Sequence, residues 1–237
     1  MKPVVIMRHA PTEGPGYFAT SLERHGVPRR LVRIDAGEPL PALSECSGLA
    51  FMGGPMSAND ALPWIEPALA LIRDAVAQGV PVIGHCLGGQ LMAKAMGGVV
   101  TRNPVKEIGW GAVEVVPGAL AEHWFGEPIA AFDAFHWHGE TFSIPPGATR
   151  LASSAHCANQ VFALGPHLAM QCHVEMTGEL IAAWCKDWEK EVASLARRVP
   201  SVQSPEEMMS DLDARIARLS AIADRIYARW ISGLGSA

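Results

Sequence analysis

Residues 80–90 read VPVIGHCLGGQ. An apolar run leads into a Gly-x-Cys-x-Gly sequence centred on Cys86, and residues typical of a helix follow. This order predicts a strand, a tight turn and a helix, with the side chain of Cys86 raised above the sheet at the turn. The flanking glycines permit a strained backbone and the close approach of a neighbouring strand. Because the helix dipole favours a thiolate at a helix N-terminus, Cys86 is a candidate nucleophile.

A buried, inert cysteine in a strand–helix turn is the alternative interpretation, and it is the usual one for an isolated cysteine. The two glycines around Cys86 favour a functional role instead. The other four cysteines lack this setting. Their irregular spacing, the odd total of five and the absence of a CxxC pair predict neither a disulfide framework nor a zinc knuckle. A reducing, cytoplasmic environment is the expectation.

Apolar strands and helical patterns alternate through the first half of the chain. Strands are expected at residues 3–7, 31–34, 48–52 and 80–85, and helices at 17–25, 64–78 and 88–96. The second half is rich in β patterns at 99–116, 131–138, 149–154 and 161–173, and a helix is expected at 177–195. This order predicts an α/β fold with a parallel or mixed sheet and helices on both faces.

The region after Pro200 has a helical pattern of its own. Ser204 and Glu207 form a capping-box pattern, with Pro205 at the first helical position. Apolar residues at spacings of three or four then predict one long amphipathic helix ending near Trp230. We therefore expect a domain over 1–199 and a C-terminal helical extension over 200–237. The extension would pack on the domain or form an oligomer or partner interface.

The composition excludes several classes of protein. Hydrophobic residues make up 49% of the 237 residues and charged residues 18%, which suits a compact domain rather than a disordered chain. The formal net charge is −5 and no basic block occurs, so we expect no nucleic-acid partner. No uninterrupted apolar run reaches the roughly 18 residues of a membrane span. The apolar start ends at Arg8, too early for a signal peptide.

A thiolate nucleophile needs a base and a group that orients the base. Residues 168–175 read LAMQCHVE, an apolar strand that ends with His173 and Glu175. In an extended chain residues i and i+2 point to the same side, so Glu175 can lie alongside His173. Both would lie at the carboxyl edge of the sheet, where the strand before Cys86 also ends. Taken alone, the pair has a surface polar contact as its alternative interpretation.

Attack on an amide carbonyl creates an oxyanion that needs fixed N–H donors, each worth roughly 3–4 kcal/mol of the barrier. One expected donor is the N–H after the nucleophile, at Leu87. Residues 51–57, FMGGPMS, follow another apolar strand, and Gly54 is the expected second donor. An ordinary turn is the alternative interpretation of this segment. The sequence leaves open whether the oxyanion hole is preformed.

The segments GGPMS, GHCLGGQ and HVE, in this order, closely resemble the signatures of the class I glutamine amidotransferases. The nearest likeness is to stand-alone proteins similar to the glutaminase domain of GMP synthase, over about residues 3–188. The resemblance implies a flavodoxin-like sheet and a triad of Cys86, His173 and Glu175. It implies that Cys86 attacks the side-chain amide of glutamine, that ammonia leaves, and that water hydrolyses the γ-glutamyl thioester. No cofactor or metal is expected.

The resemblance also implies contacts with the substrate. Gln90, in the C-x-G-x-Q pattern that begins at Cys86, matches a family position that contacts the bound substrate. The segment FHWHGET at 135–141 looks like the family's histidine-containing loop near the substrate. The candidate contacts are Gln90, Trp137, His138 and Gly139. The family usually has a proline where this chain has Val174.

A metal site is the alternative interpretation of the same loop. His136, His138 and Glu140 share one face of the predicted strand, so they could act as three ligands. Alternating His and Glu residues on a surface strand are the more common explanation.

Three hypotheses of function remain open. The chain could be a glutaminase that delivers ammonia to a separate synthase subunit, because no ATP-pyrophosphatase or P-loop signature follows the glutaminase-like region. It could instead be a free-standing γ-glutamyl peptidase or hydrolase acting on a small γ-glutamyl compound. A non-catalytic regulatory module is disfavoured by the intact triad. Homo-oligomerisation is a further expectation that the sequence does not decide.

Overall fold

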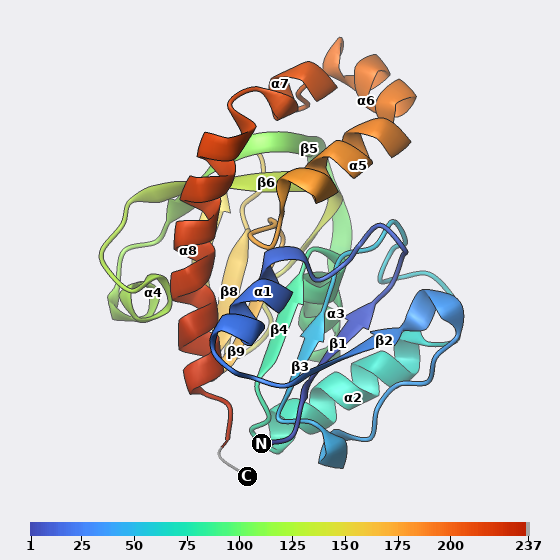
Figure 1. Cartoon of the computed structure of the whole chain (residues 1–237), viewed down its shortest axis with the longest axis vertical. Helices are drawn as coiled ribbons and strands as arrows, with labels where there is room; N and C mark the ends of the chain where they lie inside the picture. Colours follow the sequence, from blue (N-terminus) through green and yellow to red (C-terminus); the bar gives the residue numbers. More distant parts are fainter. Residues whose placement is uncertain (236–237) are drawn as a thin grey trace.

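The computed structural model describes residues 1–235 and contains a nine-stranded sheet in the order β2-β1-β3-β4-β9-β8-β7-β5-β6 (Figure 1). The strands are β1 (Val4–Arg8), β2 (Arg29–Arg33), β3 (Gly48–Phe51), β4 (Val82–His85), β5 (Val100–Val115), β6 (Ala131–Phe142), β7 (Thr149–Ser154), β8 (Val161–Leu164) and β9 (His167–Met170). The run from β2 to β9 is parallel, and the pairs beyond β9 are antiparallel. The expected mixed α/β sheet is confirmed.

Helices cover both faces of this sheet (Figure 1). They are α1 (Gly16–Arg24), α2 (Ile65–Ala77), α3 (Leu87–Ala95), α4 (Ala119–Phe125), α5 (Gly178–Asp187), α6 (Glu189–Ala196), α7 (Pro205–Met209) and α8 (Leu212–Ser232). The alternation of side chains along β1 separates two cores, because Val4 and Ile6 join the α1/α8 side while Val5 and Met7 join the α2/α3 side. None of the helices between residues 1 and 235 combines the length and apolar character needed to cross a membrane.

The start of α3 packs unusually close to the sheet. A Cβ atom added at Gly88 would lie 2.0 Å from the backbone oxygen of Phe51, and one at Gly89 would lie 2.5 Å from that of Met170. Glycine is therefore required at both positions, because any side chain would push α3 off strands β3 and β9. This close approach carries the residue before α3, Cys86, onto the carboxyl edge of the parallel strands.

We expect Gly88→Ala to destabilise the protein by about 3 kcal/mol or more, since the added methyl group meets rigid backbone rather than a side chain that can move. Urea unfolding followed by circular dichroism measures this change. Gly14→Ala is the matched control, because a Cβ there meets no heavy atom within 4 Å. Equal stability of the two variants would contradict the packing argument.

The C-terminal region corrects the prediction of one long helix. It forms α7 and α8, separated by Ser210 in an extended conformation and by Asp211 with a φ of 52°. Neither conformation continues an α-helix. The capping box is confirmed: the side chain of Ser204 accepts from the N–H of Glu207, and the Glu207 carboxylate accepts from the N–H of Ser204.

Helix α8 packs along α1 and α4. Its buried residues, including Tyr227 and Trp230, belong to the same core as Phe18 of α1. The proposed boundary between 1–199 and 200–237 stays a prediction, but the interior of the fold is continuous across it.

Two other predictions are wrong in detail. The helix expected over 177–195 is two helices, because the backbone leaves the helical conformation at Trp188 (φ −113°, ψ 16°). The strand expected to run into His173 ends at Met170, and His173 is held by a single antiparallel bridge to Phe135. Helix α4 was not predicted at all.

Candidate active site

Cys86 occupies the sharp turn between β4 and α3. Its φ of 50° and ψ of −107° are strained for a residue with a side chain, and within residues 1–235 only Asp211 is another non-glycine residue with positive φ. The turn is fixed by a hydrogen bond from the Cys86 N–H to the carbonyl of Met170, 2.8 Å long. The strand–turn–helix arrangement predicted around Cys86 is therefore present.

His173 and Glu175 form a buried ion pair. The distance between His173 Nδ1 and Glu175 Oε1 is 2.6 Å, so Nδ1 carries the proton and the carboxylate accepts it. Burial alone would lower the pKa of His173, but the charge of Glu175 and the neighbouring Cys86 raise it well above its usual value. Burial alone would raise the pKa of Glu175, yet His173 lowers it to about 2. The pair is arranged to hold an imidazolium.

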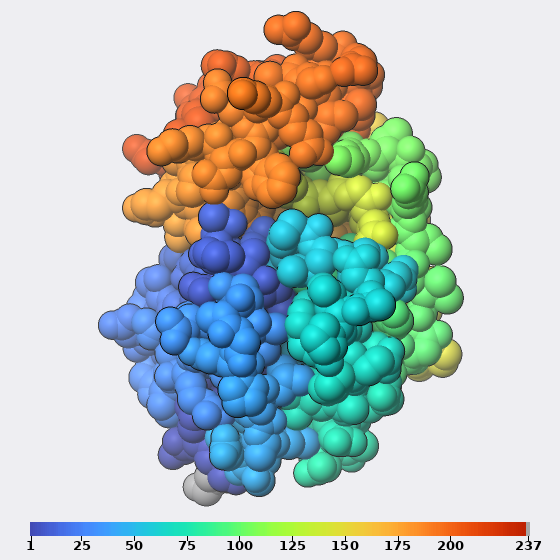
Figure 2. Space-filling model, turned by 90° about the vertical axis from the view of Figure 1, so that its right-hand side faces the viewer, coloured from blue at the N-terminus to red at the C-terminus, as the bar shows by residue number. Residues whose placement is uncertain are grey.

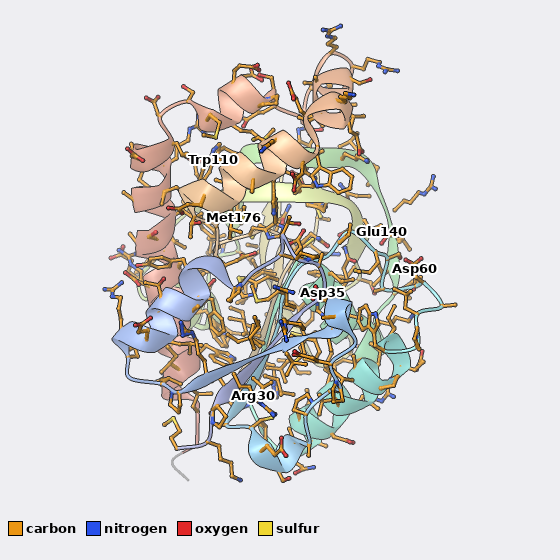
Figure 3. The ribbon with its side chains drawn as sticks, turned by 45° about the vertical axis from the view of Figure 1, so that its right-hand side comes forward. Arg30, Asp35, Asp60, Trp110, Glu140 and Met176 are labelled. Atoms are coloured by element: carbon orange, nitrogen blue, oxygen red, sulfur yellow. The ribbon has the colours of Figure 1, made fainter. Side chains whose placement is uncertain are left out.

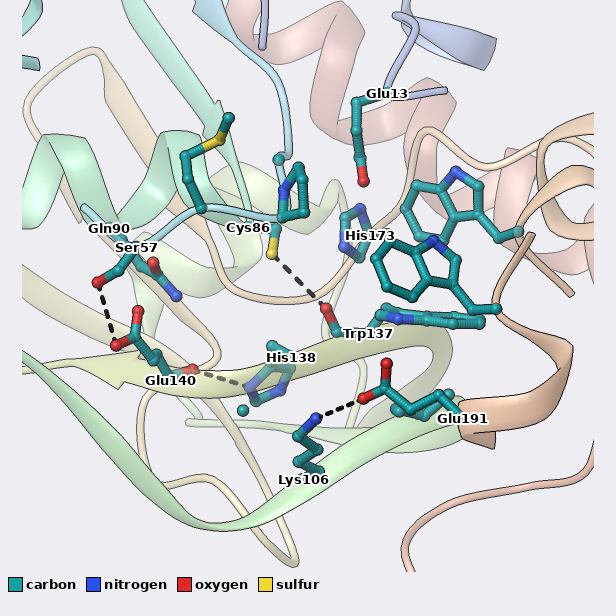
Figure 4. A pocket seen from close by; sticks show the side chains of 17 residues that line it. Glu13, Ser57, Cys86, Gln90, Lys106, Trp137, His138, Glu140, His173 and Glu191 are labelled. Atoms are coloured by element: carbon teal, nitrogen blue, oxygen red, sulfur yellow. Dashed lines mark hydrogen bonds and ion pairs between the residues drawn. The ribbon is translucent and has the colours of Figure 1, made fainter. Parts of the chain in front are cut away.

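The second ring nitrogen of His173 is available for proton transfer. His173 Nε2 is buried and has no hydrogen-bond partner within the described part of the chain. His173 and Cys86 both line the same pocket, and Figure 4 shows the two side chains next to each other there. The amide of Gln171 points at the sulfur from another side, with Nε2 3.5 Å from Cys86 Sγ. A donor at this position stabilises a thiolate.

A buried layer lies behind the ion pair. His85 Nε2 lies 3.9 Å from Glu175 Oε2 and 2.9 Å from the hydroxyl of Tyr227, which comes from α8. Burial lowers the pKa of His85, so this imidazole is neutral at pH 7. The C-terminal helix thus supports the candidate triad through one intervening side chain.

Gly54 and Leu87, the expected oxyanion donors, lie next to each other. A Cβ built at Gly54 would be 2.8 Å from Leu87 Cδ2 and 3.2 Å from His9 Cβ. Leu87 is the first residue of α3, so its N–H has no carbonyl partner within the helix. Gly54 lines the pocket that contains Cys86.

His9 anchors the loop that carries Gly54. Its Nδ1 lies 3.0 Å from the carbonyl oxygen of Met52 and 3.3 Å from that of Gly53, so Nδ1 must carry the proton. Burial lowers the pKa of His9 to about 4, so the ring stays neutral. Because the C=O and N–H of a trans peptide point in opposite directions, the Gly54 N–H points away from His9.

The pocket around Cys86 has a volume of about 400 Å³. Its mouth lies where the helical segment α5–α7 overhangs the N-terminal half, with β5 and β6 visible between them (Figure 2). All four predicted substrate contacts line it: Gln90, Trp137, His138 and Gly139. The carbonyl oxygen of Trp137 is 3.8 Å from Cys86 Sγ. Gln90 donates to Gln171, the residue that in turn donates to the sulfur.

One wall of the pocket joins the loop that carries Gly54 to strand β6. The hydroxyl of Ser57 donates to Glu140 Oε1 across 3.1 Å. Figure 3 shows Glu140 on the side of the molecule where the loop containing Asp60 lies. This contact closes the pocket on the side away from His173.

The predicted metal ligands do not assemble. Within residues 1–235, the only three-residue group of suitable ligand atoms is Glu107, His138 and Cys157, rather than His136, His138 and Glu140. Glu107 is already hydrogen-bonded by Ser154 and Gln160, at 2.7 and 2.8 Å.

Cys157 also has partners of its own. Its sulfur lies 3.1 Å from the hydroxyl of Thr141 and donates to the carbonyl of Asn159, and burial raises the pKa of its thiol. Glu107 Oε2 also lies 3.0 Å from His138 Nε2. We interpret the group as a support that fixes the His138 ring in the pocket wall.

Sequence reasoning missed Glu13, which lies in the pocket near His173 (Figure 4). A Cβ built at Gly53 would be 2.5 Å from Glu13 Oε2 and 3.3 Å from His173 Cε1. Burial raises the pKa of Glu13 to about 7, opposed by the attraction of His173. One signal could have found Glu13 and His9: both lie in the segment between β1 and α1, which starts where the carboxyl end of β1 meets the same edge of the sheet as β4.

We expect Glu13→Gln to remove an ionisation near pH 7 from the pH profile of kcat/KM. Above this pH the carboxylate favours the imidazolium form of His173, so the wild-type rate rises with pH through this range. Stability changes in the opposite sense. Between pH 4.5 and 7 folded Glu13 keeps a proton that the unfolded chain has lost, so stability falls as the pH rises.

Glu13→Gln should therefore stabilise the protein at pH 8 by up to about 3 kcal/mol. The pH profile of kcat/KM is measured with the amide substrate. The free energy of unfolding is measured by urea unfolding at pH 5 and pH 8. Glu66→Gln on the exposed side of α2 is the control. A Glu13→Gln profile that still shows the step near pH 7 would exclude this role for Glu13.

Comparison with known proteins identifies the class. The family model "Glutamine amidotransferase class-I" matches residues 18–183. The chain therefore belongs to the class I glutamine amidotransferase family.

Among individual relatives, the chain is 31% identical over 195 residues to a glutamine amidotransferase-like protein of Salmonella typhimurium, YfeJ, covering 78% of this chain and 80% of that one. A solved glutamine amidotransferase from Methylobacillus flagellatus superposes with a TM-score of 0.97 at 50% identity, covering 100% and 97% of the two chains. A GMP synthase of Colwellia psychrerythraea is 33% identical over 118 residues, which is 47% of this chain but 22% of that enzyme.

Proposed function

We propose that this chain hydrolyses the side-chain amide of glutamine through a γ-glutamyl thioester on Cys86. The single observation that carries the proposal is the strained Cys86 turn beside the buried His173–Glu175 pair. Cys86 and His173 both line a cavity large enough for glutamine.

The roles follow from the geometry. His173 takes the proton of the thiol, and the Cys86 sulfur forms a bond to the amide carbon. The N–H groups of Leu87 and Gly54 stabilise the oxyanion. His173 then gives the proton to the leaving nitrogen, the C–N bond breaks and ammonia departs. Water, deprotonated by His173, cleaves the thioester to glutamate and restores the thiol.

A glutamine analogue that alkylates thiols tests the proposal directly. We expect it to modify Cys86 alone among the five cysteines, as found by peptide mass spectrometry, and free glutamine to slow the modification. The other four cysteines serve as internal controls because all are buried and none lines the pocket. Labelling that glutamine does not slow would overturn the assignment of the substrate.

A synthase partner that uses the ammonia is part of the proposal. The relative named GMP synthase is matched over 22% of its length, so most of that enzyme has no counterpart in the matched segment.

A further inference from the structure

The pocket has two chemically different halves on either side of Cys86. On one side lie polar groups, with Gln90 close to the bonded pair Ser57 and Glu140 (Figure 4). On the other side lies His173, whose ring contacts the indole ring of Trp184. The halves correspond to the two parts of an amide, because the group that protonates the leaving nitrogen must face the amine and not the acyl part.

The half beside His173 is aromatic. The Trp184 ring meets the His173 ring edge-on, with centroids 5.1 Å apart, and the Trp137 ring meets Trp184 at 5.5 Å. Trp188 continues this wall to the mouth of the pocket and is 41% exposed. Ile108 completes it.

Ammonia alone would leave this wall without a contact. A leaving group with a single heavy atom fills almost none of a 400 Å³ cavity, and Trp188, which stays 41% exposed beside the buried Trp184 and Ile108, offers apolar surface to a larger group. Indole rings bind flat, apolar groups through large contact area and edge-to-face contacts.

The charges of this half select against an acidic amine. Glu13 projects into it, and at the rim the ammonium group of Lys106 is already paired with Glu191 across 2.9 Å. Above pH 7, where Glu13 is ionised, a leaving group with a carboxylate, as in a γ-glutamyl amino acid, would be repelled by Glu13.

We infer that the chain also cleaves, and prefers to glutamine, γ-glutamyl amides of an aromatic or branched apolar amine with no further charged group, whose amine part lies between Trp137, Trp184 and Trp188. This inference rests on the proposed function and names its substrate class. The reaction is the same thioester sequence: the C–N bond breaks, His173 protonates the leaving nitrogen, and glutamate and the free amine are released.

The test compares glutamine, glutamate γ-phenethylamide and γ-glutamyl-phenylalanine as substrates of the purified chain. We expect kcat/KM for the phenethylamide to exceed that for glutamine at least tenfold, and to exceed that for the dipeptide. Trp188→Ala should lower the phenethylamide-to-glutamine ratio at least tenfold. Leu120→Ala, which truncates another exposed apolar side chain outside the pocket, is the control and should leave the ratio unchanged.

Binding provides a second measurement that does not require turnover. Titration calorimetry on Cys86→Ala should show tighter binding of the phenethylamide than of glutamine, and Trp188→Ala in that background should remove the difference. Cleavage of glutamine with no preference for the phenethylamide, or an equal effect of Trp188→Ala on both, overturns the inference and leaves the proposed function intact. Failure of every γ-glutamyl compound to be cleaved or bound overturns both.

Discussion

Cys86→Ala is expected to lower the rate of amide hydrolysis by at least about 10⁴-fold, leaving only the residual effect of the oxyanion donors and of substrate binding. The substitution removes the sulfur that forms the thioester and adds no bulk to the pocket. Alanine accepts the φ of 50° no worse than cysteine does, so the turn between β4 and α3 should persist. Release of ammonia or amine and of glutamate measures the effect.

Cys46→Ala is the matched control for this variant. Cys46 is also buried and unpaired, but its sulfur donates to the carbonyl of Ala42, and it does not line the pocket. We expect it to keep the wild-type rate. If Cys86→Ala turned over substrate as fast as Cys46→Ala, the nucleophile would have to be a different residue.

Glu175→Gln is expected to lower kcat by about 10³ to 10⁴-fold, although glutamine has nearly the same size and shape as glutamate. The charge that opposes the burial of His173 disappears, so the pKa of the imidazole falls and the thiolate–imidazolium pair loses its stabilisation. An amide in place of the carboxylate can also hold the ring in the wrong tautomer. Alkylation of Cys86 by iodoacetamide, followed against pH, reports the thiolate directly, and its rise should move to higher pH.

Glu179→Gln makes the same chemical change four residues further on, at the exposed start of α5. We expect its kcat and its alkylation profile to match those of the wild type. Identical profiles for Glu175→Gln and the wild type would mean that His173 does not depend on this carboxylate.

The parts of the fold that were predictable from sequence are those determined by local pattern. The Gly-x-Cys-x-Gly turn and the capping box at Ser204 depend on neighbours in the chain, and both are present. The break at Asp211 was missed because the spacing of apolar residues continues across it, so periodicity alone carries no sign of it. Helix α4 is seven residues long, too short for a periodic pattern to stand out.

The contact between His173 and Glu175 was predictable from residue type and spacing, although the strand before them ends at Met170. Their supports were not, because they come from distant elements. Gln171 is recognisable only once β9 lies beside β4, and Glu107 only once β5 pairs with β6 behind His138. Glu13 belongs to the same group. The raised pKa of Glu13 is caused by its burial, and the sequence of residues 9–14 gives no sign that this side chain is buried.

The hydrogen bond between Tyr227 and His85 has a consequence for the order in which the candidate site is completed during synthesis. The ribosome makes the Cys86 turn and the His173–Glu175 segment before it makes α8. A nascent chain can therefore contain Cys86, His173 and Glu175 and still lack the hydroxyl group that contacts His85. Docking of residues 212–232 is therefore the step that completes this buried layer, and it can follow only after the rest of the chain has been made.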